Sequence, residues 1–296
     1  MAYEKEKNIP FGFLNIYKPK GMTSHDVVAK VRKILHIKQV GHTGTLDPFA
    51  TGVLPIAIGK ATKLIEYLDD DKEYIATVQF GKTTDTYDLE GEVTETFDKK
   101  VTEVEVVEAL KSFEGEISQI PPIYSAIKVN GKKLYDYARA GQQVEIKSRQ
   151  VKIFKIELID FDYENQAAKI VVACSVGTYI RSIAYDLGIQ LGCGGYLTAL
   201  ERTKAGKFDV QDAVELDKLP NMEIVIQNLI YPTEVLDFPC YNMDDIERSR
   251  VLNGMYIYNN KFTPEDIVFL IYSGKIYAIG MVKDNKIFVK KVFEVL

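Results

Sequence analysis

One segment constrains this chain more than any other: residues 41–55, which read GHTGTLDPFATGVLP. Proline at position 48 disfavours helical backbone at Asp47 and favours an extended conformation. The three glycines of the segment permit tight turns and the close approach of a ligand. Asp47 is the only acidic residue there and has no basic residue beside it. We therefore expect a loop that presents one carboxylate; the alternative for such an Asp-Pro pair is an Asx turn or a helix cap in a surface loop.

Three further elements accompany this segment: KPKGMTS (residues 18–24), KEY (72–74) and GTYIRS (177–182). In order and spacing, they and the longer string GHTGTLDPFATGVLPIAIGKATK (41–63) resemble the motifs of the bacterial TruB family of pseudouridine synthases. The resemblance spans about residues 10 to 210. Because a chance match of four ordered elements is very improbable, the chain is identified as a member of this family.

The resemblance implies an enzyme that isomerises uridine 55 to pseudouridine in the T-loop of tRNA, by base flipping and an aspartate-dependent rearrangement of the glycosidic bond. It implies tRNA as the partner and neither a metal nor an organic cofactor. A rival hypothesis is a tRNA-binding folding chaperone in which catalysis is secondary. A phosphate-binding metabolic enzyme is suggested by the glycine-rich loop alone, but the chain lacks a GxGxxG or GxxxxGK[ST] pattern.

The resemblance also assigns the site residues. It gives Asp47 the catalytic role and places Arg181 beside it, where a guanidinium can hold a carboxylate by paired hydrogen bonds. Arg181 has an alternative role as a phosphate-contacting or surface residue. Tyr74 is expected to stack on the flipped base and to take part in proton removal, whereas core packing is the alternative for a tyrosine on a strand.

Four further residues match family positions around the nucleotide. Tyr179 and Leu200 are expected to line its pocket, with a plain core role as the alternative for Leu200. His42 is expected to help take up the flipped nucleotide, and as a general base it is the rival of Tyr74. Lys18 is expected either to brace the Asp47 loop or to touch RNA, while Lys20 could equally be a solvated surface residue.

Charge is distributed unevenly along the chain. The formal net charge of −5 does not favour an RNA partner, since phosphates are bound chiefly by Lys and Arg. Residues 124–155, however, contain eight basic residues and two acidic ones, whereas residues 66–116 contain sixteen acidic and five basic ones. We expect the basic stretch to be an RNA-gripping insertion that uses Lys132, Lys133, Arg139 and Arg149; a solvated charged face is the alternative.

Periodicity and capping patterns predict the elements around these motifs. Alternating apolar residues at positions 74, 76, 78 and 80 indicate a strand, and capping-box spacing at Thr23 and Thr102 predicts a helix after each. Further strands are expected at 12–17, 53–58, 151–161, 169–175, 267–272, 275–282 and 286–292, further helices at 61–68, 134–140 and 178–191, and a loop at 81–91.

We expect an α+β fold in two domains: a catalytic domain with a mixed β-sheet at residues 1–235 and a small PUA-like β-barrel that binds RNA at 236–296, joined by a linker at 232–239. No run of about 18 apolar residues and no apolar amino-terminal stretch is present. We therefore expect a cytoplasmic protein without membrane contact, and a monomer. The three cysteines lack metal-ligand spacing and are expected to be buried, reduced thiols.

Overall fold

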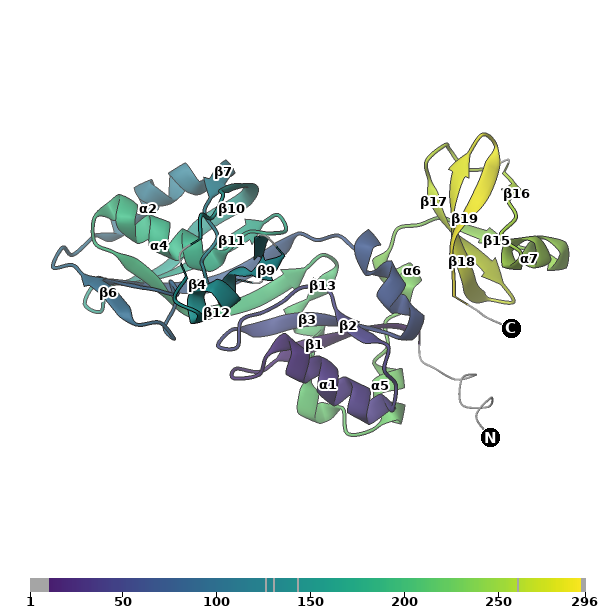
Figure 1. Cartoon of the computed structure of the whole chain (residues 1–296), viewed down its shortest axis with the longest axis horizontal. Coiled ribbons are helices and arrows are strands. Elements are labelled where there is room, and N and C mark those ends of the chain that lie inside the picture. Colours follow the sequence, from purple (N-terminus) through teal and green to yellow (C-terminus); the bar gives the residue numbers. More distant parts are fainter. Residues whose placement is uncertain (1–10, 126, 130, 143, 260, 294–296) are drawn as a thin grey trace.

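The computed structural model describes residues 11–293 with the exception of 126, 130, 143 and 260. Figure 1 shows an elongated molecule in which one large sheet crosses the left and middle of the view, with helices packed against it. A small β module that contains the carboxy-terminal strands lies at the right. The expected α+β fold with a mixed sheet is confirmed. Among the described residues, no helix is long and apolar enough to cross a membrane.

The large sheet has ten strands in the order β14-β1-β3-β12-β4-β11-β10-β7, with β2 paired to β3 and β13 paired to β12. Its strands are β1 (Gly12–Lys18), β2 (Val40–His42), β3 (Thr51–Ile58), β4 (Lys72–Phe80), β7 (Gly115–Gln119), β10 (Arg149–Asp162), β11 (Ala167–Cys174), β12 (Gly195–Ala205), β13 (Phe208–Asp209) and β14 (Val214–Glu215). Most neighbours are antiparallel, but β12 runs parallel to β3 and β14 runs parallel to β1. All five strands predicted in this part of the chain are present.

The helices begin where the caps predicted them. Thr23 and Thr102 each form a capping box, with Asp26 and Glu105 respectively. The α-helices are α1 (Ser24–Leu35), α2 (Glu103–Leu110), α3 (Leu134–Arg139), α4 (Ile180–Leu191), α5 (Met222–Gln227), α6 (Pro232–Val235) and α7 (Asp245–Leu252), and the 3-10 helices are η1 (Gly59–Tyr67), η2 (Lys111–Phe113), η3 (Val210–Asp212) and η4 (Leu216–Lys218). Helix α4 starts two residues later than expected, so Tyr179 is its N-cap.

Strand β12 was not predicted, although it is central to the sheet. It pairs with β3 through Glu201 and Arg202 and with β4 along nearly its whole length. Two irregularities in its register, at Leu197/Ala199 and Arg202/Lys204, interrupt the alternation of its side chains. By joining β3 to β4, this strand connects the part of the sheet that carries the Asp47 loop to the part that carries Tyr74.

The segment expected to be a loop at 81–91 contains a short strand. Strands β5 (Lys82–Thr84) and β6 (Val93–Thr96) form a two-stranded sheet. The turn between them holds Asp88, whose side chain is almost fully buried, with 5% of its surface exposed. This burial of a carboxylate in a polar turn is explained by its partners, described below.

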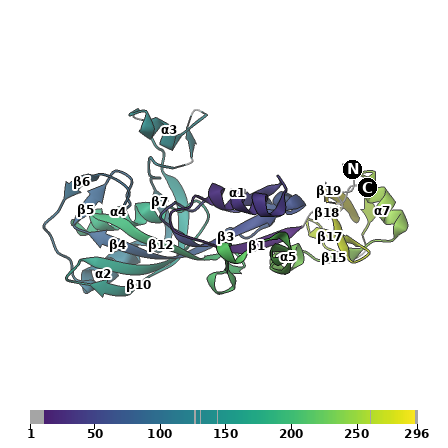
Figure 2. The same ribbon diagram turned by 90° about the horizontal axis from the view of Figure 1, so that it is seen from below.

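The basic insertion projects from the body of the protein. Figure 2 shows α3 at the tip of a segment that stands away from the sheet, with its ends rooted at β7 and β10. A second two-stranded sheet, β8 (Lys128–Val129) and β9 (Lys132–Lys133), precedes α3. Residues 149–155, which we expected to belong to the insertion, instead form the start of β10, and 149–153 pair with β7. The insertion therefore ends earlier than expected, because its last residues are held by ladder hydrogen bonds.

The carboxy-terminal module is a five-stranded sheet in the order β15-β17-β18-β19-β16. Its strands are β15 (Cys240–Asn242), β16 (Ile257–Tyr258), β17 (Ile267–Tyr272), β18 (Lys275–Lys283) and β19 (Lys286–Val292). The three strands predicted here are confirmed. The curled sheet is consistent with the expected PUA-like barrel.

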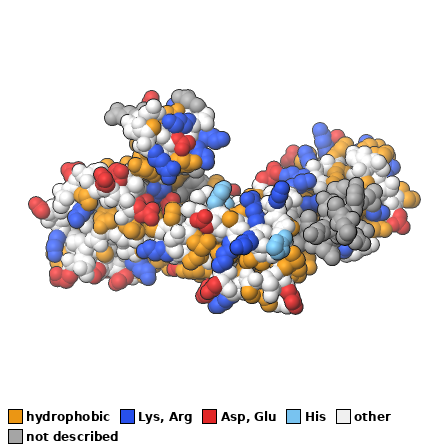
Figure 3. All heavy atoms as spheres, turned by 60° about the horizontal axis from the view of Figure 1, so that its bottom comes forward, with side chains coloured by type: hydrophobic (Ala, Val, Ile, Leu, Met, Phe, Trp, Pro, Cys, Tyr) orange, Lys and Arg blue, Asp and Glu red, His pale blue; other side chains and the backbone are white. Residues whose placement is uncertain are grey.

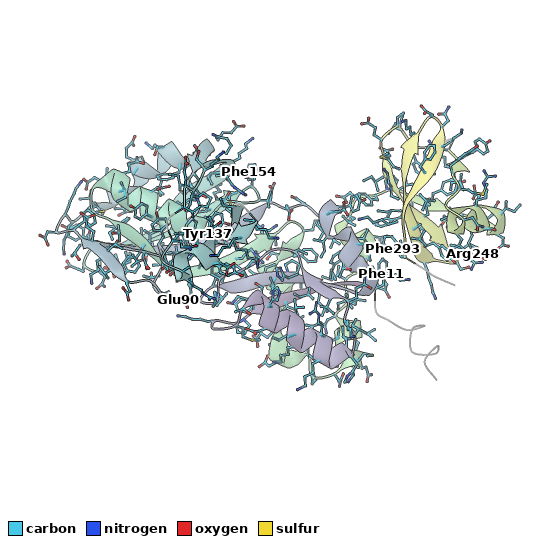
Figure 4. The ribbon with its side chains drawn as sticks, viewed as in Figure 1. Phe11, Glu90, Tyr137, Phe154, Arg248 and Phe293 are labelled. Carbon is cyan, nitrogen blue, oxygen red and sulfur yellow. The ribbon has the colours of Figure 1, made fainter. Side chains whose placement is uncertain are left out.

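The expected linker at 232–239 is not an open connection. Helix α6 occupies part of it, and Val235 and Leu236 are buried in an apolar cluster shared by both sheets. In the same cluster, Phe11 faces Phe293 with ring centroids 5.2 Å apart (Figure 4). The module is thus packed against the large sheet. Of the three thiols expected to be buried, Cys240 is exposed, because it lies on the edge strand β15.

Candidate active site

The Asp47 loop lies between β2 and β3, and the side chains of Lys18 and Ser24 hold its backbone in place. Lys18, with no exposed surface, donates to the carbonyl oxygen of Pro48 at 3.2 Å. The Ser24 hydroxyl accepts from the Leu46 amide at 2.9 Å and lies 3.2 Å from the carbonyl oxygen of the same residue. These contacts fix the backbone on both sides of Asp47, so the loop presents its carboxylate in a defined direction.

Arg202 of β12 fixes the two ends of the loop. This residue is buried, and its Nε donates to the Val53 carbonyl at 2.6 Å while its Nη2 donates to the Gly44 carbonyl at 3.2 Å. At Gly52, φ is +101° and a Cβ atom would lie 2.3 Å from the Arg202 carbonyl oxygen. Only glycine fits where β3 and β12 approach this closely.

Asp47 and Arg181 form a bidentate ion pair. The Arg181 Nε lies 3.0 Å from Oδ2 of Asp47, and the Nη2 lies 3.2 Å from Oδ1. The remaining donors of the guanidinium reach the Asp88 carboxylate at 3.3 Å, the Thr86 carbonyl at 3.2 Å and the Tyr124 carbonyl at 3.0 Å. A guanidinium has five N–H groups; here both Nη atoms donate two hydrogen bonds each, and Nε is in the ion pair with Asp47. Arg181 is therefore held rigidly, which favours pairing with Asp47 over a surface role.

The pKa of Asp47 is raised above its ordinary value because protein atoms crowd around the carboxyl group. The charges of Arg181 and Lys18 act in the opposite direction, and that of Asp88 adds to the increase. The Asp47 side chain nevertheless keeps 31% of its surface exposed, so a substrate can reach it. The charge of Arg181 is the largest of the effects that lower the pKa of Asp47 and so favour its ionised form.

Lys18 has an unusual environment for an ammonium group. Its Nζ donates to the carbonyl oxygens of Met22 at 2.6 Å, Pro19 at 3.0 Å and Pro48. Burial lowers the pKa of Lys18 to about 8, although the Asp47 charge opposes the shift. Of the two roles expected for Lys18, this geometry favours bracing the loop, because the ammonium group has no exposed surface with which to touch RNA.

Tyr74 lies on β4 opposite Arg202 of β12, with 8% of its surface exposed. Leu200, 7% exposed, pairs with Ala76 on the same face of the sheet. Burial raises the pKa of Tyr74, and the charge of Arg202 partly offsets this. The phenol is therefore protonated at neutral pH, which favours Tyr74 as a stacking or hydrogen-bonding residue over a phenolate base.

His42 ends β2, and its ring lies 5.7 Å from that of His25 in an edge-to-face arrangement. Among the described residues, the buried Nδ1 atom of His42 has no hydrogen-bond partner. Burial and the neighbouring cationic side chains lower the pKa of His42. Its imidazole is thus neutral at physiological pH.

Tyr179 is half-buried and precedes Arg181 by two residues at the start of α4. Its backbone N–H and C=O groups are both bonded to the side chain of Gln119, at 2.7 and 3.0 Å. The structure therefore brings Arg181 into direct contact with Asp47 and Lys18 into contact with the next residue, Pro48. It places Tyr179 at the N-cap of the helix that carries Arg181.

The four RNA-binding candidates lie outside this cluster. Lys132 stacks over the Tyr137 ring at 4.6 Å, and Lys133 and Arg139 lie 5.2 and 5.5 Å from the Tyr135 ring. Figure 3 shows Lys and Arg side chains on the projecting segment. Arg149 is exposed at the first position of β10, at the base of that segment. Basic and aromatic groups are thus interleaved on one projection, a composition that suits nucleic acid.

Sequence reasoning missed three residues of the site: Asp88, Arg202 and Gln119. Asp88 and Arg202 are buried and charged, and each contacts segments distant in the chain. Asp88 lies in a polar, acidic stretch in which no single carboxylate stands out. Gln119 is not part of any sequence motif. The strand that Gln119 ends is broken by the adjacent Ile120-Pro121-Pro122. This break was the only sequence signal that a sheet strand gives way to the insertion here.

Two family models match the chain. Residues 32–180 match the model described as TruB family pseudouridylate synthase (N terminal domain), and residues 181–236 match that of the tRNA pseudouridylate synthase B C-terminal domain. The chain is 41% identical to tRNA pseudouridine synthase B of Clostridium kluyveri over 95% of its length and 99% of the relative. It is 44% identical to that of Streptococcus thermophilus over 90% of its length and 94% of the relative.

Solved structures of similar fold point to the same family of enzymes. A Cbf5-Nop10-Gar1 complex contains a chain with 27% identity and a TM-score of 0.72, covering 98% of this chain and 87% of that one. An H/ACA ribonucleoprotein bound to a substrate RNA has a chain with 26% identity and a TM-score of 0.70 at the same coverage. The mixed sheet is thus that of a pseudouridylate synthase. Within that class, the chain belongs to the TruB family.

Proposed function

We propose that this enzyme converts uridine 55 in the T-loop of tRNA to pseudouridine. The observation that carries the proposal is the Asp47–Arg181 ion pair, which offers one partly exposed carboxylate that interacts electrostatically with the buried Tyr74. The tRNA substrate follows from the relatives' names, and the chains of similar fold include one from a ribonucleoprotein bound to a substrate RNA.

The reaction breaks the bond between C1′ of the ribose and N1 of uracil, rotates the detached base, and joins C1′ to C5. C5 loses a proton and N1 gains one, so no atom is lost and nothing is oxidised. Asp47 attacks the sugar, adds to the pyrimidine, or removes a sugar proton; its placement is compatible with each. Arg181 keeps the carboxylate charged, and Lys18 holds the loop in place.

The nucleotide has to leave its stacked position before Asp47 can reach the ribose, and everting it opposes stacking by a few kcal/mol. Tyr74, Leu200, Tyr179 and His42 supply the apolar and aromatic surface that would receive the base. The projecting insertion, with Lys132, Lys133 and Arg139 beside its tyrosines, would hold the phosphates of the T arm.

The domain division belongs to the same proposal: a catalytic domain at 1–235 and a PUA-like RNA-binding domain at 236–296. It is supported by the two separate sheets and by a family match that ends at residue 236. The shared apolar cluster implies that the two domains would bind tRNA as one body.

The test is tritium release from a tRNA transcript labelled at C5 of its uridines. We expect release from the unmodified transcript and none above background from a transcript with cytidine at position 55. Release from both transcripts would place the target elsewhere in the tRNA. Absence of release from either would refute the enzymatic assignment.

A further inference from the structure

The root of the insertion, residues 119–125, is tied to the first turn of α4. Gln119 ends β7 and is 2% exposed. Its side-chain Oε1 accepts from the Tyr179 amide at 2.7 Å, and its Nε2 donates to the Tyr179 carbonyl at 3.0 Å. One buried side-chain amide thus bonds both backbone groups of the N-cap residue of α4.

This bonding has a specific reason. The first amides of a helix have no partner within the helix and need a cap. Tyr179, the N-cap of α4, makes no capping hydrogen bond with its own side chain. The cap region is instead held by a glutamine from the neighbouring sheet, so the position of the helix start depends on where the insertion leaves β7.

Two further hydrogen bonds join the same segments. The Ser182 hydroxyl donates to the Ile120 carbonyl at 2.8 Å, and Arg181 Nη2 donates to the Tyr124 carbonyl at 3.0 Å. The arginine that holds Asp47 is therefore also bonded to the insertion root. Because Nη2 donates to both Tyr124 and Asp47, a movement of Tyr124 would free one of its N–H groups and disturb the contact with Asp47.

We propose that Gln119 is a positioning residue for the isomerisation: through Tyr179 it sets the first turn of α4 and directs Arg181 at Asp47. Together with the bonds of Ser182 and Arg181 to the root, the Gln119 side chain thereby couples the insertion to the ion pair of Asp47 and Arg181. This inference rests on the proposed function, since it assumes that Asp47 is the reacting carboxylate.

Ser125 supports the idea of coupling. Its hydroxyl is buried and has no hydrogen-bond partner among the described residues. A buried hydroxyl without a partner is unfavourable. This unsatisfied hydroxyl lies in the root, next to Tyr124, whose carbonyl oxygen accepts from Arg181.

The experiment compares Gln119→Glu with a matched control, Gln166→Glu. Gln166 is also buried and forms the same two-way bond with one backbone residue, accepting from the Val101 amide at 2.7 Å and donating to its carbonyl at 3.1 Å. It lies at the turn before β11, far along the sheet from Tyr74. Both substitutions keep side-chain size and remove one donor, so both should lower the thermal unfolding midpoint.

For Gln119→Glu we expect kcat for tritium release to fall about 10- to 100-fold, the loss typical of a small misplacement of catalytic groups. The dissociation constant for tRNA should stay close to that of the wild type. The ratio of variant to wild-type kcat should rise as the pH falls, because a protonated carboxyl donates to the Tyr179 carbonyl again. Gln166→Glu should keep its kcat.

The proposal is overturned if Gln119→Glu keeps wild-type kcat, or if both variants lose kcat equally. Should Gln119→Glu fail to fold, Ser182→Ala, which removes the bond to Ile120, is judged by the same comparison of kcat with tRNA affinity. Failure of the proposed function gives a different result, since then the wild-type enzyme itself releases no tritium from tRNA.

Discussion

Asp88 holds Arg181 from the side opposite Asp47, with 3.3 Å between its Oδ2 and the Nη1 of the arginine. Asp88 is itself fixed by the Thr86 hydroxyl at 2.6 Å and the Glu90 amide at 3.0 Å. A single buried guanidinium thus lies between two carboxylates, of which only Asp47 is accessible. The inaccessible one orients the arginine, and the charge of the arginine lowers the pKa of the accessible one.

Asp88→Asn should therefore reduce kcat by about tenfold or more, because the amide that bonds to Thr86 and Glu90 would turn its NH₂ group toward Arg181. The tRNA dissociation constant should change little. Asp85→Asn is the control: its side-chain oxygen accepts from the Glu92 amide in the same turn, which asparagine can also do. Equal losses in the two variants would show that the turn matters, and not the contact with Arg181.

Asp47→Asn should abolish turnover and leave tRNA binding nearly intact, because the amide keeps the shape of the carboxylate and loses its charge. The expected decrease in the single-turnover rate is at least about a hundredfold. Rate and affinity are measured on the same labelled transcript. A rate within about tenfold of the wild type would be too fast for an essential carboxylate.

Tyr74→Phe and Tyr74→Leu separate the ring from the hydroxyl. Phenylalanine keeps the aromatic face on β4, so base eversion and RNA affinity should survive, whereas leucine removes the face and should weaken both. Fluorescence of a base analogue at the target position reports eversion. If phenylalanine impairs affinity as severely as leucine, stacking is not what Tyr74 contributes.

Replacing Lys132, Lys133, Arg139 and Arg149 with neutral residues should weaken tRNA binding and flatten its dependence on salt. Each lost phosphate contact changes the slope of log affinity against log salt by about 0.7 on single strands and 0.9 on duplex, so four contacts amount to roughly 3 units. The control neutralises Lys82, Lys99, Lys100 and Lys111, which lie in the acidic stretch 66–116. An unchanged slope in the first variant would identify the basic insertion as a solvated face.

Activity should decline above a pH of about 8 as Lys18 loses its proton, since its pKa is lowered to about 8 by burial. The neutral amine has two N–H groups for three carbonyl oxygens, and it no longer places a positive charge near Asp47. Lys18→Met should be less active and lack this alkaline decline, whereas Lys20→Met, at an exposed neighbouring position, should retain it. The same decline in Lys18→Met would assign it to another group.

The lowered pKa of Lys18 should also make the free energy of unfolding depend on pH. The unfolded chain binds the Lys18 proton more tightly than the folded one, so burial of the charged lysine destabilises the fold at neutral pH. That penalty fades as the pH rises from about 8 toward the ordinary lysine pKa of 10.5. The unfolding free energy of the wild type should therefore improve relative to Lys18→Met across this interval, as measured by urea titration at each pH.

Local chemistry in the sequence decided a large part of this structure. The helix starts at Thr23 and Thr102 follow from capping boxes, which depend on residues three positions apart. Strand β4 follows from strict alternation, and the presentation of Asp47 follows from Pro48 and the surrounding glycines. Each of these depends on neighbours in the chain, so each could be predicted without knowing the fold.

Strand β12 could not be predicted from local sequence patterns. Its sequence, GYLTALERTKA, is rich in residues with good helix propensity. Two register irregularities also break the alternation that would mark it as a strand. It becomes a strand because β3 and β4 offer ladder hydrogen bonds on both sides, and tertiary pairing overrides local propensity.

The candidate site likewise has features that the sequence predicts and features that only the tertiary structure sets. The sequence by itself determined which carboxylate is presented and that a tyrosine strand and an arginine helix accompany it. Only the tertiary structure brought Arg181 to Asp47 across 134 positions of the chain and placed Asp88, Arg202 and Gln119 around them. Their roles arise from buried charges and amides that need partners, and those partners are set by how distant segments pack.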